Sequence, residues 1–319
     1  MSPSEKRLAG LVAAAFTPLR ADGSLNLDLI PALVDRMASD GVAGLYVLGS
    51  TGEGASLTAR ERTAVAEAFV EAARGRMPTI IQVGHNSVAE ARAFAEHAQR
   101  IGADAISAMP PSYFKPGSVA ALVASLAEIA RGAPDLPFYY YHIPDATGVH
   151  PNMEEFLDAA AAKLPTLAGI KFSDCRLHEL LLCLRFGGGA YDVVFGVDEM
   201  LLGAVALGVR GAVGSTYGFA TPLYRRMLDA FERGDLERAR ADQASAAEMV
   251  RIILRHCGRA GLKAVMSLVG LDCGPYRLPQ STATPDDVAR MARALEAIGF
   301  LEWCSGSGAI APTTPGAEL

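Results

Sequence analysis

A lysine lies inside an otherwise apolar, strand-like run of the sequence, AGIKFSD (residues 168–174). Lysine is scarce in this chain: of its 29 basic residues, five are Lys and the other 24 are Arg. Burial disfavours the charged form of an amine, and an uncharged amine can attack a ketone and form a Schiff base. Lys171 is therefore a candidate covalent catalyst. The alternative is a lysine that reaches solvent from the end of a strand or pairs with Asp174.

The neighbours of Lys171 fit this chemistry if the run is a strand. Side chains alternate between the two faces of a strand, so Gly169, Lys171 and Ser173 share one side. We expect Gly169 to leave room around the lysine stem. In a barrel of parallel strands, catalytic groups lie at the carboxyl ends of the strands, where Lys171 would be.

A glycine-rich stretch, GSTGEG (49–54), follows another apolar run. It offers the hydroxyls of Ser50 and Thr51 together with backbone N–H groups, a combination that can bind a carboxylate. The alternative is an ordinary strand-to-helix loop.

A third stretch, YYYHIPDATG (139–148), ends a run in three tyrosines, and Tyr139 and Tyr141 share a face. A phenol beside an iminium could carry a proton, because a neighbouring positive charge lowers the pKa of the phenol. Aromatic strand packing is the alternative and would suit Tyr139 and Tyr140.

A fourth stretch, FGVDEM (195–200), carries two acids, Asp198 and Glu199. Their carboxylates could bind sugar hydroxyls. The alternative is a pair of acids at a helix N-terminus, where the helix dipole favours negative charge.

Eight short apolar runs recur along the first 230 residues, and stretches with helical periodicity lie between them. One of these stretches begins with Thr58 and Glu61 at the spacing of a capping box. Strands that alternate with amphipathic helices are typical of a parallel sheet covered by helices. Eight such units fit a closed (β/α)8 or TIM barrel of the α/β class better than an open doubly wound sheet, although spacing does not exclude the latter. The expected strands are residues 10–16, 44–49, 79–84, 104–109, 137–142, 168–173, 192–197 and 211–216.

After residue 230 the pattern changes to helices alone. We expect residues 1–230 to form the barrel and residues 231–302 to form a C-terminal helical extension of the same domain. The final stretch, 303–319, lacks periodicity and is rich in Gly, Ser, Pro and Thr, which predicts a mobile tail.

The bulk composition favours a small-molecule partner. The net charge of −6 and the absence of a Lys or Arg run argue against nucleic acid or an anionic membrane as the main partner. The five cysteines are scattered without metal-binding spacing, which predicts reduced thiols in a cytoplasmic protein.

The start of the chain, MSPSEKRLAGLVAAAF, has basic residues before an apolar run, as a signal peptide does. The stretch TPLRADGS follows where a small-residue cleavage site would be expected, and the apolar run is too short to span a membrane. We therefore expect residues 10–16 to form a buried first strand.

Taken together, these stretches resemble the family of pyruvate-dependent class I aldolases that contains N-acetylneuraminate lyase and dihydrodipicolinate synthase. The resemblance covers about residues 8–300 and rests on GSTGEG, YYYHIP, GIKFSD, FGVDEMLLGAVALG and GAVGSTY. The combination is most similar to the sialic acid lyase branch. It implies a (β/α)8 barrel with a C-terminal helical extension, usually assembled as a homotetramer, that uses no metal or cofactor.

The resemblance also implies a role for each matching residue. Lys171 would form the Schiff base with pyruvate or with the ketone of open-chain sialic acid, and Tyr141 would shuttle the proton as the carbon–carbon bond breaks. Ser50 and Thr51 would hold the carboxylate of the keto acid. Tyr113, in PPSYFKP, matches an aromatic position near a subunit boundary. The residues that match sugar-contacting positions are Ser173, Gly196, Asp198, Glu199 and Ser215.

Departures from the family patterns bear on the substrate. Dihydrodipicolinate synthases typically have two threonines in the glycine-rich turn and an arginine two residues after the proline of the tyrosine motif, where this chain has Ser50 and Ala146. Without that guanidinium, the carboxylate of aspartate semialdehyde lacks its bidentate partner. Sialic acid lyases commonly continue GSTY with Asn, where this chain has Gly218. This last change bears on the shape of the loop after the eighth strand, not on Schiff base chemistry.

Other readings stay open at this point. Related aldolases act on 2-keto-3-deoxy sugar acids or aromatic aldehydes, and they share the lysine and the tyrosine. Dihydrodipicolinate synthase activity is a further enzymatic alternative. A barrel that binds a keto acid without catalysis is the alternative from another class, because a fold does not prove activity, although Lys171 and Tyr141 argue against it.

Overall fold

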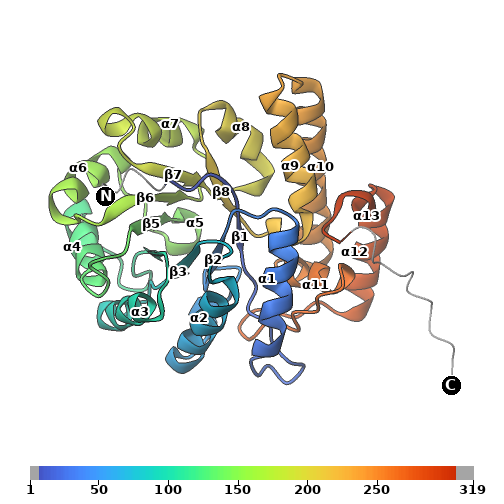
Figure 1. Ribbon diagram of the computed structural model, residues 1–319, viewed down its shortest axis with the longest axis horizontal. Coiled ribbons are helices and arrows are strands. Elements are labelled where there is room, and N and C mark those ends of the chain that lie inside the picture. Colours follow the sequence, from blue (N-terminus) through green and yellow to red (C-terminus); the bar gives the residue numbers. More distant parts are fainter. Residues whose placement is uncertain (1–6, 307–319) are drawn as a thin grey trace.

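The computed structural model of the protein describes residues 7–306. Eight parallel strands close into a barrel in which each strand pairs with the next along the chain and the last pairs with the first (Figure 1). This confirms the predicted (β/α)8 barrel. The strands are β1 (Gly10–Ala14), β2 (Gly44–Val47), β3 (Thr79–Gln82), β4 (Ala105–Ala108), β5 (Phe138–His142), β6 (Leu167–Phe172), β7 (Asp192–Phe195) and β8 (Gly211–Gly214).

Helices cover the outside of the barrel. The predicted capping box opens one of them, because the Thr58 hydroxyl accepts from the Glu61 N–H while the Glu61 carboxylate accepts from the Thr58 N–H. The helices from α1 to α9 are α1 (Ile30–Ser39), α2 (Ala59–Ala73), α3 (Val88–Ile101), α4 (Val119–Ala130), α5 (Pro144–Thr147), α6 (Met153–Lys163), α7 (Leu177–Arg185), α8 (Leu201–Ala206) and α9 (Tyr217–Glu232).

The strands are buried on both faces, which explains their continuous apolar sequences. On β6, Ile170 and Phe172 pack toward the helices. The inward side chains form a separate cluster inside the barrel, made of Val12, Ala14, Tyr46, Ile80, Ala105, Tyr139, Tyr141, Ala168, Val194 and Val213. A charged group on the inward face of β6 is therefore surrounded by apolar and aromatic side chains.

The predicted C-terminal extension is present as α10 (Leu236–Cys257), α11 (Ala260–Leu268), α12 (Pro285–Ala297) and α13 (Phe300–Trp303). Figure 1 shows these orange and red helices gathered on one side of the barrel, near α1 and α9. Hydrogen bonds tie them there: Arg36 of α1 donates to the carbonyl of Val269, 3.2 Å away.

The packed part of the chain extends further than the sequence predicted. Trp303 and Cys304 are buried, and the N–H of Ser305 donates to the carbonyl of Phe219 in α9, 2.7 Å away. Residues 303–305 are therefore packed on the extension rather than being part of the predicted tail. The remainder of that tail, 307–319, lies outside the described residues.

The expected first strand is confirmed, because β1 lies in the barrel between β2 and β8. Within residues 7–306, no helix combines the length and the apolar character needed to cross a membrane.

Gly169 lies where β6 passes close to β7. A Cβ on this residue would lie 1.9 Å from the carbonyl oxygen of Asp192 and 2.9 Å from the ring of Tyr139. The glycine therefore lets β6 approach the backbone of β7. Its predicted role in leaving room around the lysine stem stays a prediction.

Gly169→Ala is expected to destabilise the protein by about 1–3 kcal/mol, because the new methyl group can be accommodated only if backbone moves. Denaturant unfolding measures the loss. The matched control is Gly117→Ala, where no atom lies within 4 Å of the added Cβ, and its stability should stay within about 0.5 kcal/mol of the parent. Equal stabilities for the two variants would show that the close approach of β6 to β7 does not require glycine at position 169.

Candidate active site

Lys171 lies in β6 directly beside Tyr141 in the parallel register with β5. Its side chain points into the barrel, and the residue is only 5% exposed. The Nζ atom lies 3.7 Å from the ring centroid of Tyr141 and 4.2 Å from that of Tyr46. Asp174 pairs instead with Arg176, 2.7 Å away. The amine is therefore neither in solvent nor paired with Asp174, which contradicts both alternatives that the sequence left open. A catalytic role for Lys171 stays a prediction.

The phenol of Tyr141 has a lowered pKa. Burial alone would raise the pKa of Tyr141, but the charge of Lys171 and the hydroxyls of Ser50 and Ser173 outweigh it and lower that pKa. The Tyr141 hydroxyl lies 3.4 Å from Oγ of Ser50. The phenol therefore gives up its proton at a lower pH than an ordinary tyrosine.

The glycine-rich turn after β2 lies beside this pair. Oγ1 of Thr51 lies 2.8 Å from Oγ of Ser215, which follows β8. The turn after β2 is therefore joined to the loop after β8, across β1. The backbone N–H groups of Ser50 and Thr51 donate to no protein group within residues 7–306. Hydroxyls and open N–H groups at one place suit a carboxylate.

A cavity of about 180 Å³ opens at the carboxyl ends of β7 and β8. Four of the predicted sugar-contacting residues line it: Gly196, Asp198, Glu199 and Ser215. The fifth, Ser173, lies against Gly196, because a Cβ on that glycine would be 2.0 Å from Oγ of Ser173. The structure thus brings together all five residues that the sequence placed at the sugar end.

The two acids in this cavity differ in their surroundings. Oδ2 of Asp198 accepts from the N–H and the hydroxyl of Thr216, at 2.9 and 2.7 Å, so this carboxylate holds the turn after β8 as well as lining the cavity. Glu199 is half-buried, and burial raises the pKa of its carboxyl, with the charge of Asp198 adding to the effect. Glu199 is thus more exposed than Asp198 and is the acid better placed to contact a ligand.

Sequence analysis missed several residues of the site. Tyr46 faces Lys171 from β2 and donates to Oγ of Ser107, 3.0 Å away. The sequence signal was a tyrosine within the apolar run GLYVLG, whose inward orientation depends on the register. The C-terminal extension supplies part of the cavity wall, including the exposed Arg259, and no local pattern marks these residues.

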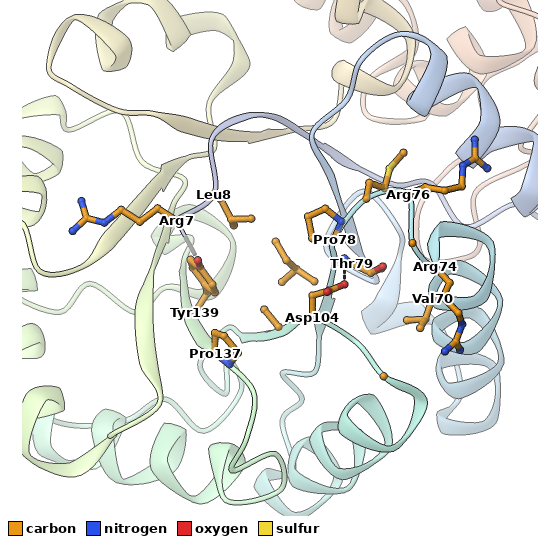
Figure 2. A pocket seen from close by; sticks show the side chains of 15 residues that line it. Arg7, Leu8, Val70, Arg74, Arg76, Pro78, Thr79, Asp104, Pro137 and Tyr139 are labelled. Atoms are coloured by element: carbon orange, nitrogen blue, oxygen red, sulfur yellow. Dashed lines mark hydrogen bonds between the residues drawn. The ribbon is translucent and has the colours of Figure 1, made fainter. Parts of the chain in front are cut away.

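A larger cavity, about 710 Å³, lies away from this chemistry at the amino ends of the strands. Figure 2 shows Tyr139, Thr79 and Asp104 around it, with the guanidinium groups of Arg7 and Arg76 directed away from its centre. None of the residues that line it was predicted as a site residue. Active sites of such barrels lie at the carboxyl ends, which favours the smaller cavity.

Known proteins are similar to this chain over most of its length. The model of the dihydrodipicolinate synthetase family matches residues 7–298. The chain belongs to that family. It is 43% identical over 283 residues to N-acetylneuraminate lyase A of Xenopus laevis, covering 88% of this chain and 92% of the relative. With N-acetylneuraminate lyase of Mus musculus it shares 40% identity over 306 residues, 94% of this chain and 96% of the relative.

Solved structures of the family agree in fold. The N-acetylneuraminate lyase of Proteus mirabilis superposes with a TM-score of 0.90 at 38% identity, covering 92% of this chain and all of the other. Gly218, the position where sialic acid lyases commonly have Asn, lies in the first turn of α9. A Cβ there would meet its nearest side chains at 3.9 Å. This is ordinary contact, so the turn after β8 keeps its shape without needing glycine at this position.

Tyr113 is apart from the other predicted residues. It lies on the loop between β4 and α4, where its N–H donates to Oδ1 of Asn86, 3.1 Å away. Its side chain is 77% exposed and packs edge-on against Phe114. Its predicted place at a subunit boundary stays a prediction.

An ultraviolet titration of tyrosinate should show one tyrosine that deprotonates below the usual range, and Tyr141→Phe should remove that component. The matched control is Tyr140→Phe on the opposite face of β5. Burial raises the pKa of Tyr140, and its hydroxyl has no partner in the described residues, so this variant should keep the early component. Identical titrations for the parent and Tyr141→Phe would contradict the lowered pKa.

Proposed function

We propose that this protein is a Schiff-base aldolase that cleaves N-acetylneuraminate reversibly to N-acetylmannosamine and pyruvate. The observation that carries the proposal is the buried amine of Lys171, 3.7 Å from the ring centroid of Tyr141. The hydroxyl-rich turn lies beside that pair. The substrate is taken from the names of relatives that are 40–43% identical, which are N-acetylneuraminate lyases.

The first half of the reaction uses Lys171. The neutral Nζ attacks the C2 ketone of the open-chain sugar acid, and loss of water gives an iminium. Ser50 and Thr51 hold the adjacent carboxylate by their hydroxyls and N–H groups, which orients the ketone toward the amine. The rings of Tyr46 and Tyr141 flank Nζ and exclude water from it.

The second half uses Tyr141. The deprotonated phenol accepts the proton of the C4 hydroxyl, the C3–C4 bond breaks, and its electrons pass into the iminium to give an enamine. N-acetylmannosamine leaves as the aldehyde. Protonation at C3 and hydrolysis of the iminium release pyruvate and restore Lys171. Because the lowered pKa of Tyr141 makes the base available, the proton has an acceptor close to the bond that breaks.

The sugar end of the substrate extends into the cavity beyond the amine. Gly196 and Ser215 line this cavity, and Glu199 and Asp198 supply acceptors for hydroxyl groups. Since the predicted arginine contact of dihydrodipicolinate synthases is replaced by Ala146, a polyhydroxy substrate fits this end better than aspartate semialdehyde.

The assembly and location also belong to the proposal. Tyr113 and Phe114 form an exposed aromatic pair, 77% and 85% exposed, at the carboxyl end of the barrel. Exposed aromatic pairs of this kind favour a subunit contact. A homotetramer and a cytoplasmic location stay predictions, which a mass measurement in solution and localisation in cells would test.

The function is tested by pyruvate release from N-acetylneuraminate, followed by a borohydride quench and mass spectrometry of the peptide that contains Lys171. We expect turnover and a reduced adduct on Lys171. Lys171→Ala should lower turnover by at least about 1,000-fold and leave no adduct, because the nucleophile is gone. Lys163→Ala, at the exposed end of α6, is the matched control and should behave like the parent.

Other outcomes separate the alternatives. An adduct with added pyruvate but no cleavage of sialic acid would keep the Schiff base and move the substrate to another 2-keto acid, such as a 2-keto-3-deoxy sugar acid. No adduct with any keto acid would favour a barrel without this catalysis. Substantial turnover by Lys171→Ala would contradict the covalent mechanism.

Glu199→Gln is expected to raise KM for N-acetylneuraminate about tenfold, because a charged acceptor for sugar hydroxyls is replaced by a neutral one. Trapping of pyruvate on Lys171 should be unchanged, since pyruvate lacks the sugar hydroxyls that Glu199 would accept from. Glu296→Gln on the exposed face of α12 serves as the control. An unchanged KM for Glu199→Gln would remove Glu199 from the sugar contacts.

A further inference from the structure

The C-terminal extension holds the glycine-rich turn through a buried ion pair. Nζ of Lys263 in α11 donates to Oε1 of Glu53, 2.8 Å away, and each side chain is 1% exposed. Glu53 stands two residues after Thr51, whereas Lys263 is 210 residues further along the chain. The other carboxylate oxygen, Oε2, accepts from the N–H of Arg277, 3.0 Å away. Both oxygens of Glu53 are therefore bound by the extension.

Lys263 is bound as firmly as its partner. Its Nζ also donates to the carbonyl of Pro275, 2.9 Å away, so the ammonium joins the turn, α11 and the segment after α11. Burial lowers the pKa of Lys263, opposed by the charge of Glu53. Charges so deeply buried persist only when they are paired and hydrogen-bonded, and removing one partner leaves the other uncompensated.

The turn needs such a support. Glu53 has φ of 54° and Leu48 has φ of 64°, and these are the two residues other than glycine with positive φ within residues 7–306. Such backbone is strained and persists only where its surroundings impose it. The N–H of Glu53 donates to the carbonyl of Ser50, 3.3 Å away. A shift of Glu53 is thus transmitted to Ser50, and through the turn to Thr51.

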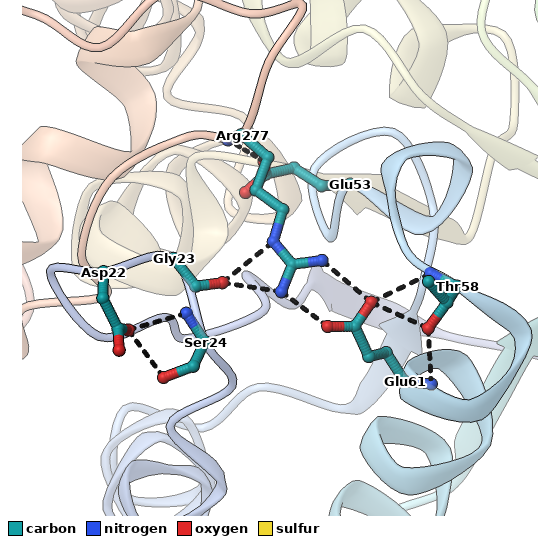
Figure 3. A network of polar contacts seen from close by, with 7 residues as sticks. All are labelled: Asp22, Gly23, Ser24, Glu53, Thr58, Glu61 and Arg277. Atoms are coloured by element: carbon teal, nitrogen blue, oxygen red, sulfur yellow. Dashed lines mark hydrogen bonds and ion pairs between the residues drawn. The ribbon is translucent and has the colours of Figure 1, made fainter.

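A second ion pair of the same segment lies further out. Figure 3 shows the guanidinium of Arg277 between Glu61 and the carbonyl of Gly23, while its backbone N–H reaches Glu53. The side chains of Arg277 and Glu61 are 21% and 24% exposed. This outer pair fastens the extension to α2 without touching the Glu53 carboxylate by its side chain.

We propose that the ion pair of Lys263 with Glu53 positions Ser50 and Thr51 to bind the carboxylate of the keto acid, so that the C-terminal extension sets substrate affinity from outside the barrel. Glu53 and Lys263 are positioning residues that do not touch the substrate. The inference rests on the proposed function, because it assigns the turn to carboxylate binding. It predicts a larger effect on affinity than on kcat, because the strands place Lys171 and Tyr141 and Ser50 is only one of the groups that lower the pKa of Tyr141.

The test compares KM and kcat for sialic acid, and the pyruvate concentration that half-saturates borohydride trapping, in three variants. Glu53→Gln and Lys263→Met should each raise KM and the half-saturating pyruvate concentration about tenfold, with kcat within about twofold of the parent. Both single variants also lose stability because they leave one buried charge unpaired.

The double variant Glu53→Gln with Lys263→Met separates positioning from stability. Neither buried charge is left unpaired in it, so its thermal stability should return toward that of the parent. Its KM should stay raised, because the ionic contact that holds the turn is still missing. If KM returned to the parental value together with stability, the ion pair would be structural only and the inference would be overturned.

Arg277→Gln is the matched control. It breaks the outer pair with Glu61 but leaves the backbone N–H of residue 277 on Glu53. We expect lower stability with parental KM, and a raised KM here would assign the effect to general loosening of the extension. If the parent itself traps no keto acid, the proposed function fails and the inference fails with it. If the parent traps pyruvate normally and the variants half-saturate at the same concentration, only the inference fails.

Discussion

The pairing of β5 with β6 sets the position of both groups that carry the proposed chemistry. Its register places Tyr141 beside Lys171, and both point into the barrel while Ile170 and Phe172 pack against the helices. A slip of one residue would turn Lys171 toward the helices and bury an aromatic ring in its place. The close approach of β6 to β7 at Gly169 opposes such a slip. The amine is thus fixed by the same packing that closes the barrel, so its geometry does not depend on any loop.

The groups proposed to bind the substrate lie on loops, so strand pairing does not fix their positions. Two of them are held by contacts with distant segments: Thr51 with Ser215 after β8, and Asp198 with Thr216, also after β8. Loops held at several points can present hydroxyls and N–H groups in a fixed arrangement while leaving them open to a ligand. The site therefore combines a rigid centre with a periphery whose order comes from tertiary contacts.

The sequence predicts the centre far better than the periphery, for a physical reason. The barrel strands are recognisable in the sequence as short apolar runs. Lys171 stands out because it is a charged residue within such a run. Tyr46 was missed because an inward tyrosine and a packed tyrosine look alike until the register is known. The contact that requires glycine at position 169 was missed because the carbonyl that approaches it belongs to a neighbouring strand. Lys263 lies in an apolar helix, and nothing local distinguishes it from a lysine whose stem packs and whose amine reaches water.

The span of the contact between Glu53 and Lys263 has a consequence for the order of folding. The ribosome releases the turn 210 residues before its partner in α11. Parallel strands can pair as they emerge, but Glu53 has no buried cation to meet until the helices after the barrel have docked. An incomplete chain would keep this carboxylate in water and its strained backbone relaxed. The barrel can thus close around Lys171 before the glycine-rich turn is held in place, and the last helices to be made complete the proposed carboxylate site.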